Sequence, residues 1–167
     1  MSGRKVTFQK LILEGFGPYR EATEFIFSES INSFVAENES GKTTMSAGLI
    51  AVLFGLSHRQ KTNTPFNLGN FRNWENPARC YGEIYFIAGS KYYQVARDFD
   101  THRVELWSLG EDFTRKELLV EGQHNPDATK RLKKYEEKIR ELLGLDSQGL
   151  FSDTFYVGQP LPEPDKI

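Results

Sequence analysis

The chain has 167 residues, of which 38% are apolar and 26% are charged, enough for one ordinary folded domain with a hydrophobic core. The formal net charge of −2 excludes a uniformly basic surface, so a contact with nucleic acid would need a local patch. The single cysteine excludes an internal disulfide and fits a reducing cytoplasm. No apolar run reaches the roughly 18 residues that a membrane helix needs.

The first part of the chain predicts three strands. Residues 5–14 have the pattern of a strand with its leucines on one face, and residues 15–19 form a turn-rich break. Thr23, Phe25 and Phe27 alternate along the chain with Ala22, Glu24 and Ile26, which predicts a half-buried second strand. Residues 31–35 form a short segment that ends in the aromatic Phe34 and the β-branched Val35, so we expect a third strand that leads into the main motif.

The main motif is a polar stretch that ends in a Gly-Lys-Thr tripeptide and reads Asn38-Glu39-Ser40-Gly41-Lys42-Thr43-Thr44. An apolar segment follows directly, from Met45 to Phe54, and predicts a buried helix ended by Gly55. A strand, a polar loop and a buried helix are the context of a phosphate-binding loop, in which main-chain N–H groups and the helix N-terminus attract anions.

In this interpretation each polar side chain has a task. Lys42 contacts the β- and γ-phosphates, the Thr43 hydroxyl binds Mg²⁺, and the Thr44 hydroxyl lies near the α-phosphate. Ala36 stands where the usual pattern has glycine, a change that close approach of the loop tolerates if φ stays negative. The alternative is a chance Gly-Lys-Thr, which the flanking strand and apolar helix argue against.

Residues 57–79 are an irregular segment in which basic and aromatic residues alternate. The basic residues are Arg59, Lys61, Arg72 and Arg79, and the aromatic ones are Phe66, Phe71 and Trp74. Two interpretations remain open. The segment contacts nucleic acid or a nucleotide base, or its aromatic rings attach it to the core while its charges are solvated.

The second half predicts an antiparallel meander, a helix and a last strand. Residues 81–88, 91–99 and 104–109 read as strands joined by short turns, with a fourth edge at residues 116–120. Asn125-Pro126 predicts the start of a helix that Gly144 ends. The charged face of this helix is solvated or, through a basic cluster at residues 130–134, contacts a DNA backbone. A short strand follows at residues 151–159 and ends in Gln159.

In this order the segments resemble the N-terminal lobe of the ABC-type ATPase heads of SMC and SbcC-type proteins, which act in DNA repair and chromosome maintenance. The resemblance covers about residues 5–160. It rests on Leu11-x-Leu13-x-Gly15-Phe16-Gly17-Pro18-Tyr19, on Asn38 to Thr44, on Leu53-Phe54-Gly55 and on Phe155-Tyr156-Val157-Gly158-Gln159. Gly17 stands where many relatives carry an arginine that contacts the nucleotide.

The resemblance implies an α/β P-loop fold in which an antiparallel meander packs around the helix after the phosphate loop. Residues 1–160 would form the N-terminal lobe, and residues 161–167 a tail toward a coiled coil. ATP and Mg²⁺ would be the cofactors. Gln159 would be the Q-loop residue that contacts Mg²⁺ and the attacking water, so Lys42 and Gln159 are the expected catalytic residues.

Parts needed for hydrolysis are missing from the sequence. No apolar run ends in Asp-Glu, which would hold Mg²⁺ and polarise water, and no Ser-Gly-Gly signature occurs. In the family these parts lie in a second lobe beyond the coiled coil. We therefore expect slow hydrolysis by this chain alone. The expected partners are the second lobe, a second head in a homodimer and DNA, with a nuclease as an open further partner, and no membrane.

Two rival functions remain open. A transporter-type ABC domain would drive a membrane partner and would continue from the Q-loop into a helical segment that carries the signature. A non-hydrolysing DNA-binding or scaffold module would have a degenerate phosphate loop, which Ala36 and the missing carboxylates would explain.

Overall fold

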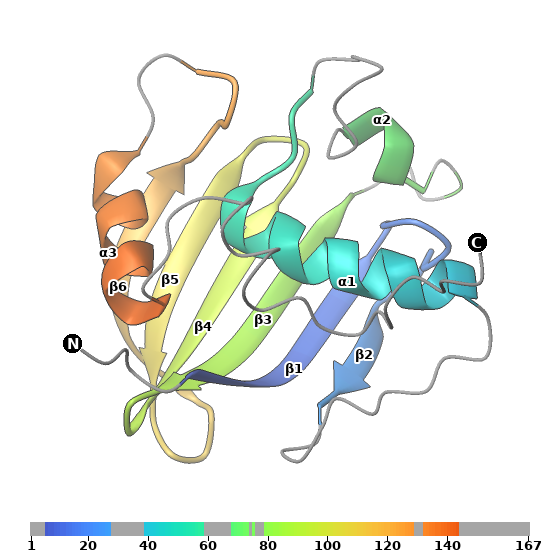
Figure 1. The fold of residues 1–167 in the computed structure, drawn as a ribbon. Helices are drawn as coiled ribbons and strands as arrows, with labels where there is room; N and C mark the ends of the chain where they lie inside the picture. Colours follow the sequence, from blue (N-terminus) through green and yellow to red (C-terminus); the bar gives the residue numbers. More distant parts are fainter. Residues whose placement is uncertain are drawn as a thin grey trace, which may run out of the picture.

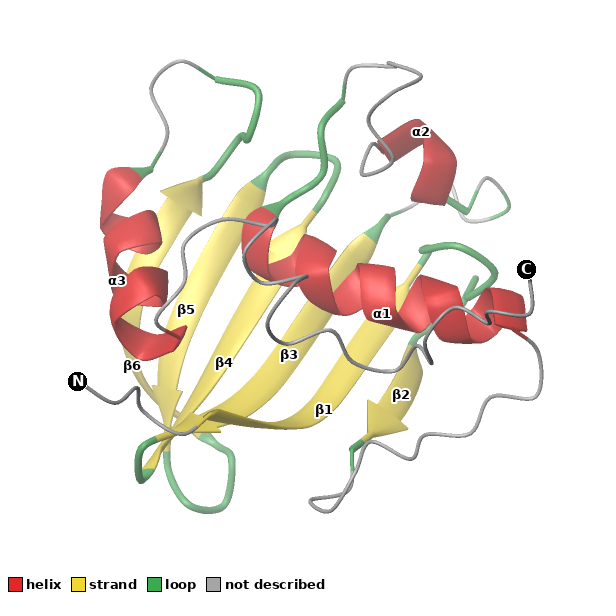
Figure 2. Ribbon diagram, in the orientation of Figure 1, coloured by secondary structure: helices red, strands yellow, loops and turns green. Residues whose placement is uncertain are grey.

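The computed structural model describes residues 6–27, 39–58, 68–73, 75, 79–128 and 132–143; the side chains of residues 39–46 and of residue 70 are outside this description. One sheet carries two longer helices on the same face (Figures 1 and 2). The elements are β1 (Val6–Glu14), β2 (Thr23–Ile26), α1 (Glu39–Phe54), α2 (Leu68–Phe71), β3 (Tyr81–Ala88), β4 (Lys91–Asp98), β5 (Arg103–Leu109), β6 (Arg115–Gln123) and α3 (Lys133–Leu143).

The sheet has six strands in the order β2-β1-β3-β4-β5-β6, and every pairing among the described strands is antiparallel. The predicted meander is confirmed, and its fourth strand, β6, is longer than predicted. Along β3 buried and half-buried residues alternate strictly, which is the period of a strand with one face against the core. The predicted strands at residues 31–35 and 151–159 lie outside the described residues.

Helix α1 crosses the sheet from its β1–β2 side toward β4 (Figure 1). Its residues from Ala47 to Phe54 are all buried, as the apolar sequence predicts. Two glycines allow the close contact between helix and sheet. A Cβ added to Gly48 would lie 2.6 Å from Leu13 Cδ1, and one added to Gly82 would lie 2.6 Å from Val52 Cγ2.

The turn after β1 packs against the segment that contains α2. Phe16 is fully buried and stacks on Phe71, with 5.1 Å between the ring centroids. The Asn73 amide N–H donates to the Gly15 carbonyl at 2.9 Å. Gly15 has a φ of +68°, and a Cβ there would lie 1.9 Å from the Arg79 carbonyl oxygen, so only glycine fits this turn.

The last helix begins later than predicted. Asn125-Pro126 does not start a helix: the Asn125 side chain accepts a hydrogen bond from the Asp127 N–H at 2.8 Å and closes a turn. Helix α3 begins at Lys133 and buries Tyr135, Ile139, Leu142 and Leu143. The turn prevails because Pro126 packs on Gly55 at the end of α1. The predicted end at Gly144 lies outside the described residues.

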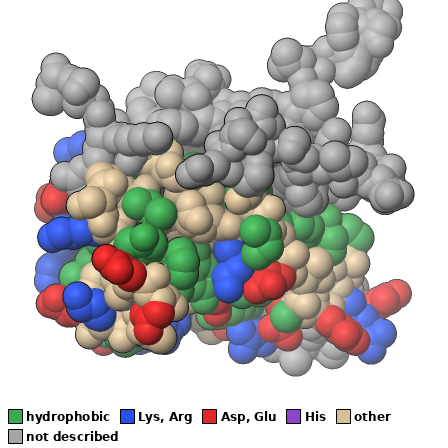
Figure 3. Space-filling view, turned by 90° about the horizontal axis from the view of Figure 1, so that it is seen from below, with side chains coloured by type: hydrophobic (Ala, Val, Ile, Leu, Met, Phe, Trp, Pro, Cys, Tyr) green, Lys and Arg blue, Asp and Glu red, His purple; other side chains and the backbone are tan. Residues whose placement is uncertain are grey.

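The visible surface carries charges of both signs. In the view from below, acidic and basic side chains lie interspersed with apolar ones (Figure 3). This mixture agrees with the small net charge of −2.

The contact between Gly48 and Leu13 yields a stability prediction. In an exposed helix, glycine-to-alanine replacement adds up to about 1 kcal/mol of stability. We expect Gly48→Ala to lower the free energy of unfolding instead, by about 1–3 kcal/mol, because the new methyl group overlaps a fully buried leucine. Urea unfolding measures this change.

Leu13→Val in the Gly48→Ala background is the matched test of the overlap. The smaller side chain makes room for the new methyl group. The double variant should therefore lose less free energy of unfolding than the two single variants lose together. Additive losses would contradict the predicted overlap.

Candidate nucleotide site

The candidate site is the N-terminus of α1. This helix begins at Glu39, so Gly41-Lys42-Thr43 belongs to its first turns and not, as predicted, to the end of a loop. Asparagine is a preferred N-cap residue, and Asn38 immediately precedes the helix. Acidic Glu39 is also favourable at the positive end of a helix. These two residues are the signals by which the earlier start could have been found.

The structure brings six of the predicted site residues into one helical segment: Glu39, Ser40, Gly41, Lys42, Thr43 and Thr44. The first four N–H groups of a helix have no partner within it, so they are available to an anion. The predicted side-chain roles of Lys42, Thr43 and Thr44 stay predictions because these side chains are not described. Asn38 and Gln159 lie outside the described residues.

The opposite end of α1 is closed by a buried arginine from β4. The Arg97 side chain is 1% exposed. Its Nε–H donates to the Val52 carbonyl at 2.8 Å, and its Nη2 donates to the Leu53 carbonyl at 3.3 Å. Carbonyl groups in the last turn of a helix have no partner within it and form the negative end of the helix dipole. Arg97 therefore supplies both the donors and the positive charge that this end needs.

A second layer of polar groups surrounds Arg97. Its Nη1 donates to the His124 carbonyl at 3.1 Å, and the His124 ring nitrogen Nε2 lies 2.7 Å from the Glu136 carboxylate. The Tyr135 hydroxyl donates to the Leu53 carbonyl at 2.6 Å. Through these contacts α3 is bonded to the end of α1.

The chain leaves α1 through Gly55, which has a φ of +93° and confirms the predicted helix end. The next residues are held by Asp127. The Ser57 hydroxyl donates to one carboxylate oxygen at 2.8 Å, and the His58 N–H donates to the other at 3.0 Å. The His58 ring stacks on His102, with 4.0 Å between the ring centroids. Ser57 and His58 are thus attached to the turn that contains Asp127, and His58 also packs against the turn between β4 and β5 that contains His102.

Burial dominates the titration of these groups. It lowers the pKa of the Arg97 guanidinium and raises the pKa of the Tyr135 hydroxyl. It also lowers the pKa of His102 to about 4, helped by the nearby His58 and Arg97. His102 is therefore neutral in the folded protein at pH 7.

Several residues of the basic and aromatic segment have structural partners. Phe71 stacks on buried Phe16, and Arg72 forms an ion pair with Asp100. Arg79 pairs with Glu14 at 3.1 Å. For these residues the contacts agree with attachment to the core. Arg59, Lys61, Phe66 and Trp74 lie outside the described residues.

Sequence reasoning missed the role of Arg97, although the sequence held a signal. Side chains in a strand alternate between the two faces. Arg97 therefore shares a face with Tyr93 and Val95, and both of these are buried. An arginine at an inward position needs a buried partner. The end of an apolar helix is such a partner.

The described residues contain no group of three or more His, Cys, Asp or Glu side chains arranged to hold a metal ion. None of the described helices is long and apolar enough to cross a membrane.

Comparison with known families agrees with the motif. A family model described as an AAA domain matches residues 10–160, a range that includes both the phosphate-loop motif and Gln159. No curated protein matches the chain significantly. The family match supports the predicted P-loop ATPase class, and it does not distinguish the SMC and SbcC-type heads from other members of that class.

Removal of the Arg97 guanidinium tests the closure of α1. We expect Arg97→Met to lower the free energy of unfolding by about 3–5 kcal/mol, because buried carbonyl groups lose their donors. Arg97→Lys keeps the charge but cannot reach all the carbonyl groups, so its loss should be smaller. Arg103→Met, at a half-exposed position in β5, is the control, with an expected loss below about 1 kcal/mol. Equal losses at both arginines would contradict the predicted role.

The neutral His102 predicts a pH-dependent stability. Its pKa is about 4 in the folded protein and about 6.5 in the unfolded chain. Protons therefore bind the unfolded state more tightly than the folded state. The contribution of neutral His102 to the free energy of unfolding is complete above about pH 6.5 and is lost as the pH decreases toward 4. The groups facing His102 are His58, His124, Arg97 and Asp127.

His102→Asn removes this titration, and asparagine accepts the φ of +67° at this position. We expect the free energy of unfolding to change less between pH 7 and pH 4.5 in the variant than in the wild type. Urea unfolding at each pH measures the difference. Parallel curves for the two proteins would assign the pH dependence to other groups.

Proposed function

The chain belongs to the AAA domain family, and from this premise we propose that it is the ATP-binding half of an SMC or SbcC-type ATPase that acts in DNA repair or chromosome maintenance. The observation that carries the proposal is the geometry of α1. Its N-terminal turns contain the Gly41-Lys42-Thr43 tripeptide, and its opposite end is neutralised by buried Arg97. A buried helix of this kind presents its positive end to an anion.

The proposed site binds the phosphates through main-chain N–H groups of the first turn of α1 and through the Lys42 ammonium group. The donor set also fits Mg²⁺, because Thr43 and Gln159 provide the neutral oxygen ligands that this ion accepts beside phosphate. Mg²⁺ would neutralise the charge on the β- and γ-phosphates. In the proposal Thr43 and Gln159 orient the phosphates and water around it.

The proposal assigns hydrolysis to a larger assembly. In the proposal a second lobe supplies the carboxylates that hold the ion and polarise water, as the SMC and SbcC-type resemblance implies. Two heads would close over two nucleotides, and DNA and a nuclease would be the further partners. The SMC and SbcC-type resemblance supports this part of the proposal.

The Lys42 ammonium group is the clearest target for a test. We expect Lys42→Ala to weaken the binding of ATP with Mg²⁺ by tenfold or more, because it removes charge-assisted hydrogen bonds worth about 1.5–3 kcal/mol each. Titration of the 167-residue chain with a fluorescent ATP analogue measures the affinity.

Lys133→Ala is the matched control, because Lys133 is an exposed lysine at the start of α3. It should bind the analogue as the wild type does. If Lys42→Ala also binds with wild-type affinity, the phosphate loop is not the nucleotide site.

A further inference from the structure

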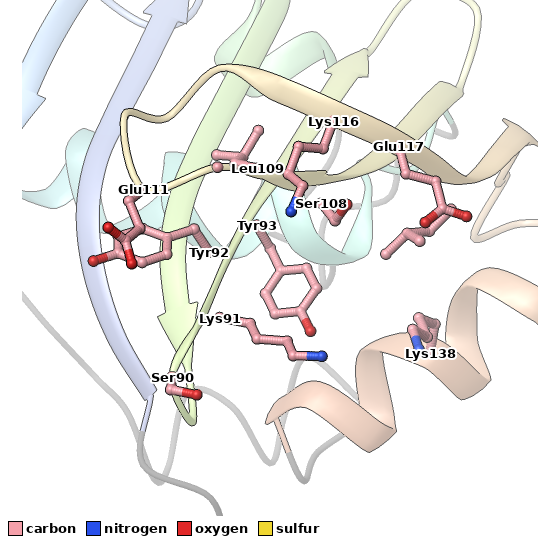
Figure 4. Close-up of a pocket in the computed structure, with 12 residues that line it drawn as sticks. Ser90, Lys91, Tyr92, Tyr93, Ser108, Leu109, Glu111, Lys116, Glu117 and Lys138 are labelled. Carbon is pink, nitrogen blue, oxygen red and sulfur yellow. The ribbon is translucent and has the colours of Figure 1, made fainter.

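A hollow of about 580 Å³ lies between α3 and the ends of β4, β5 and β6 (Figure 4). Small-molecule sites commonly have volumes of about 300–1,000 Å³. The hollow is on the β4–β6 side of the sheet, whereas α1 begins over the β1–β2 side (Figure 1). It is therefore separate from the candidate nucleotide site.

Two hydroxyl groups line the hollow without a hydrogen-bond partner in the described structure. Tyr93 is 7% exposed, and its ring stacks on Phe86 at 5.6 Å between centroids. Its hydroxyl points into the open space in Figure 4. Ser108 lies opposite Tyr93 on the neighbouring strand and also lines the hollow. The Tyr93 ring is buried, whereas its oxygen is open to the hollow and is not a buried polar atom left without a partner. The hydroxyl is therefore accessible and can donate to a ligand in the hollow.

Three ammonium groups surround the same space and come from three elements: Lys91 begins β4, Lys116 lies in β6 and Lys138 lies in α3. In the described structure neither Lys91 nor Lys116 forms an ion pair within 4 Å, whereas Lys138 shares its charge with Glu141 at 3.4 Å. Two acidic residues, Glu111 and Glu117, also line the hollow. The unpaired cations and hydroxyl donors together suit a ligand with several acceptor oxygens and negative charge.

We propose that this hollow binds a small phosphate-bearing molecule through Lys91, Lys116 and the Tyr93 hydroxyl. A phosphate group has more acceptor oxygens than a carboxylate, so it can accept hydrogen bonds from both ammonium groups and from the hydroxyl group at the same time. The Tyr93 hydroxyl belongs to a buried side chain, so a small molecule reaches it more readily than the rigid backbone of a DNA duplex. The proposal does not depend on the phosphate loop.

The test removes the phosphate loop first. Inorganic pyrophosphate is the probe, and isothermal titration calorimetry is the measurement, on the 167-residue chain carrying Lys42→Ala. We expect this protein to bind pyrophosphate. Tyr93→Phe, which keeps the ring on Phe86, and Lys116→Gln should each weaken this binding about tenfold in the same background.

Lys134→Gln is the control, since Lys134 is an exposed lysine of α3 that does not line the hollow, and it should leave the affinity within about twofold. Unchanged circular dichroism in Tyr93→Phe shows that the fold is intact. The proposal is overturned if the Lys42→Ala protein does not bind pyrophosphate, or if Tyr93→Phe and Lys116→Gln bind it as tightly as their parent. Binding of a short DNA duplex without binding of pyrophosphate would also overturn it.

Discussion

The buried contact between Arg97 and the end of α1 is the interaction on which the rest of this domain depends. A guanidinium that is 1% exposed loses its hydration, and this loss must be offset by hydrogen bonds of good geometry. The Val52, Leu53 and His124 carbonyl groups provide those bonds. These acceptors belong to α1 and to His124, which follows β6 and contacts Glu136 of α3. One side chain of β4 therefore bonds the sheet directly to α1 and, through His124, is linked to α3.

This contact also determines what the other end of α1 can do. The helix has 16 residues and spans about 24 Å, so its N-terminus is too far from Arg97 for a direct interaction. The two ends of α1 are related only because both belong to one helix whose position on the sheet is fixed. Gly48 fits against Leu13 and Gly82 against Val52, so the helix cannot slide or roll without overlap. This packing determines how α1 lies on the sheet, and with it the direction in which its N-terminal turn points.

Local patterns in the sequence are sufficient for the strands among the described residues and for the position of the helix that carries the motif. Strict alternation in residues 81–88 and short polar turns predict β3 and its hairpin because each strand pairs with a neighbour in sequence. The Gly-Lys-Thr tripeptide before an apolar run identified the helix that carries the candidate site. The helix start at Glu39 is harder to predict, because Ser40 and Gly41 are weak helix formers that favour a loop, whereas the cap preference of Asn38 favours the earlier start.

The parts that sequence reasoning did not reach depend on partners distant in the chain. Arg97 bonds with Val52 across 45 positions, and Tyr135 bonds with Leu53 across 82. A similarly large separation in sequence explains why the predicted helix start at Asn125-Pro126 is wrong. Asn125-Pro126 has the local sequence of a helix N-terminus. In the structure, however, Asp127 accepts a hydrogen bond from Ser57 and Pro126 lies next to Gly55, and the turn places both residues for these contacts. Long-range contacts therefore override the local helix propensity of Asn125-Pro126. For Arg97, an inward-facing arginine in a strand is the sequence signal that a long-range contact exists.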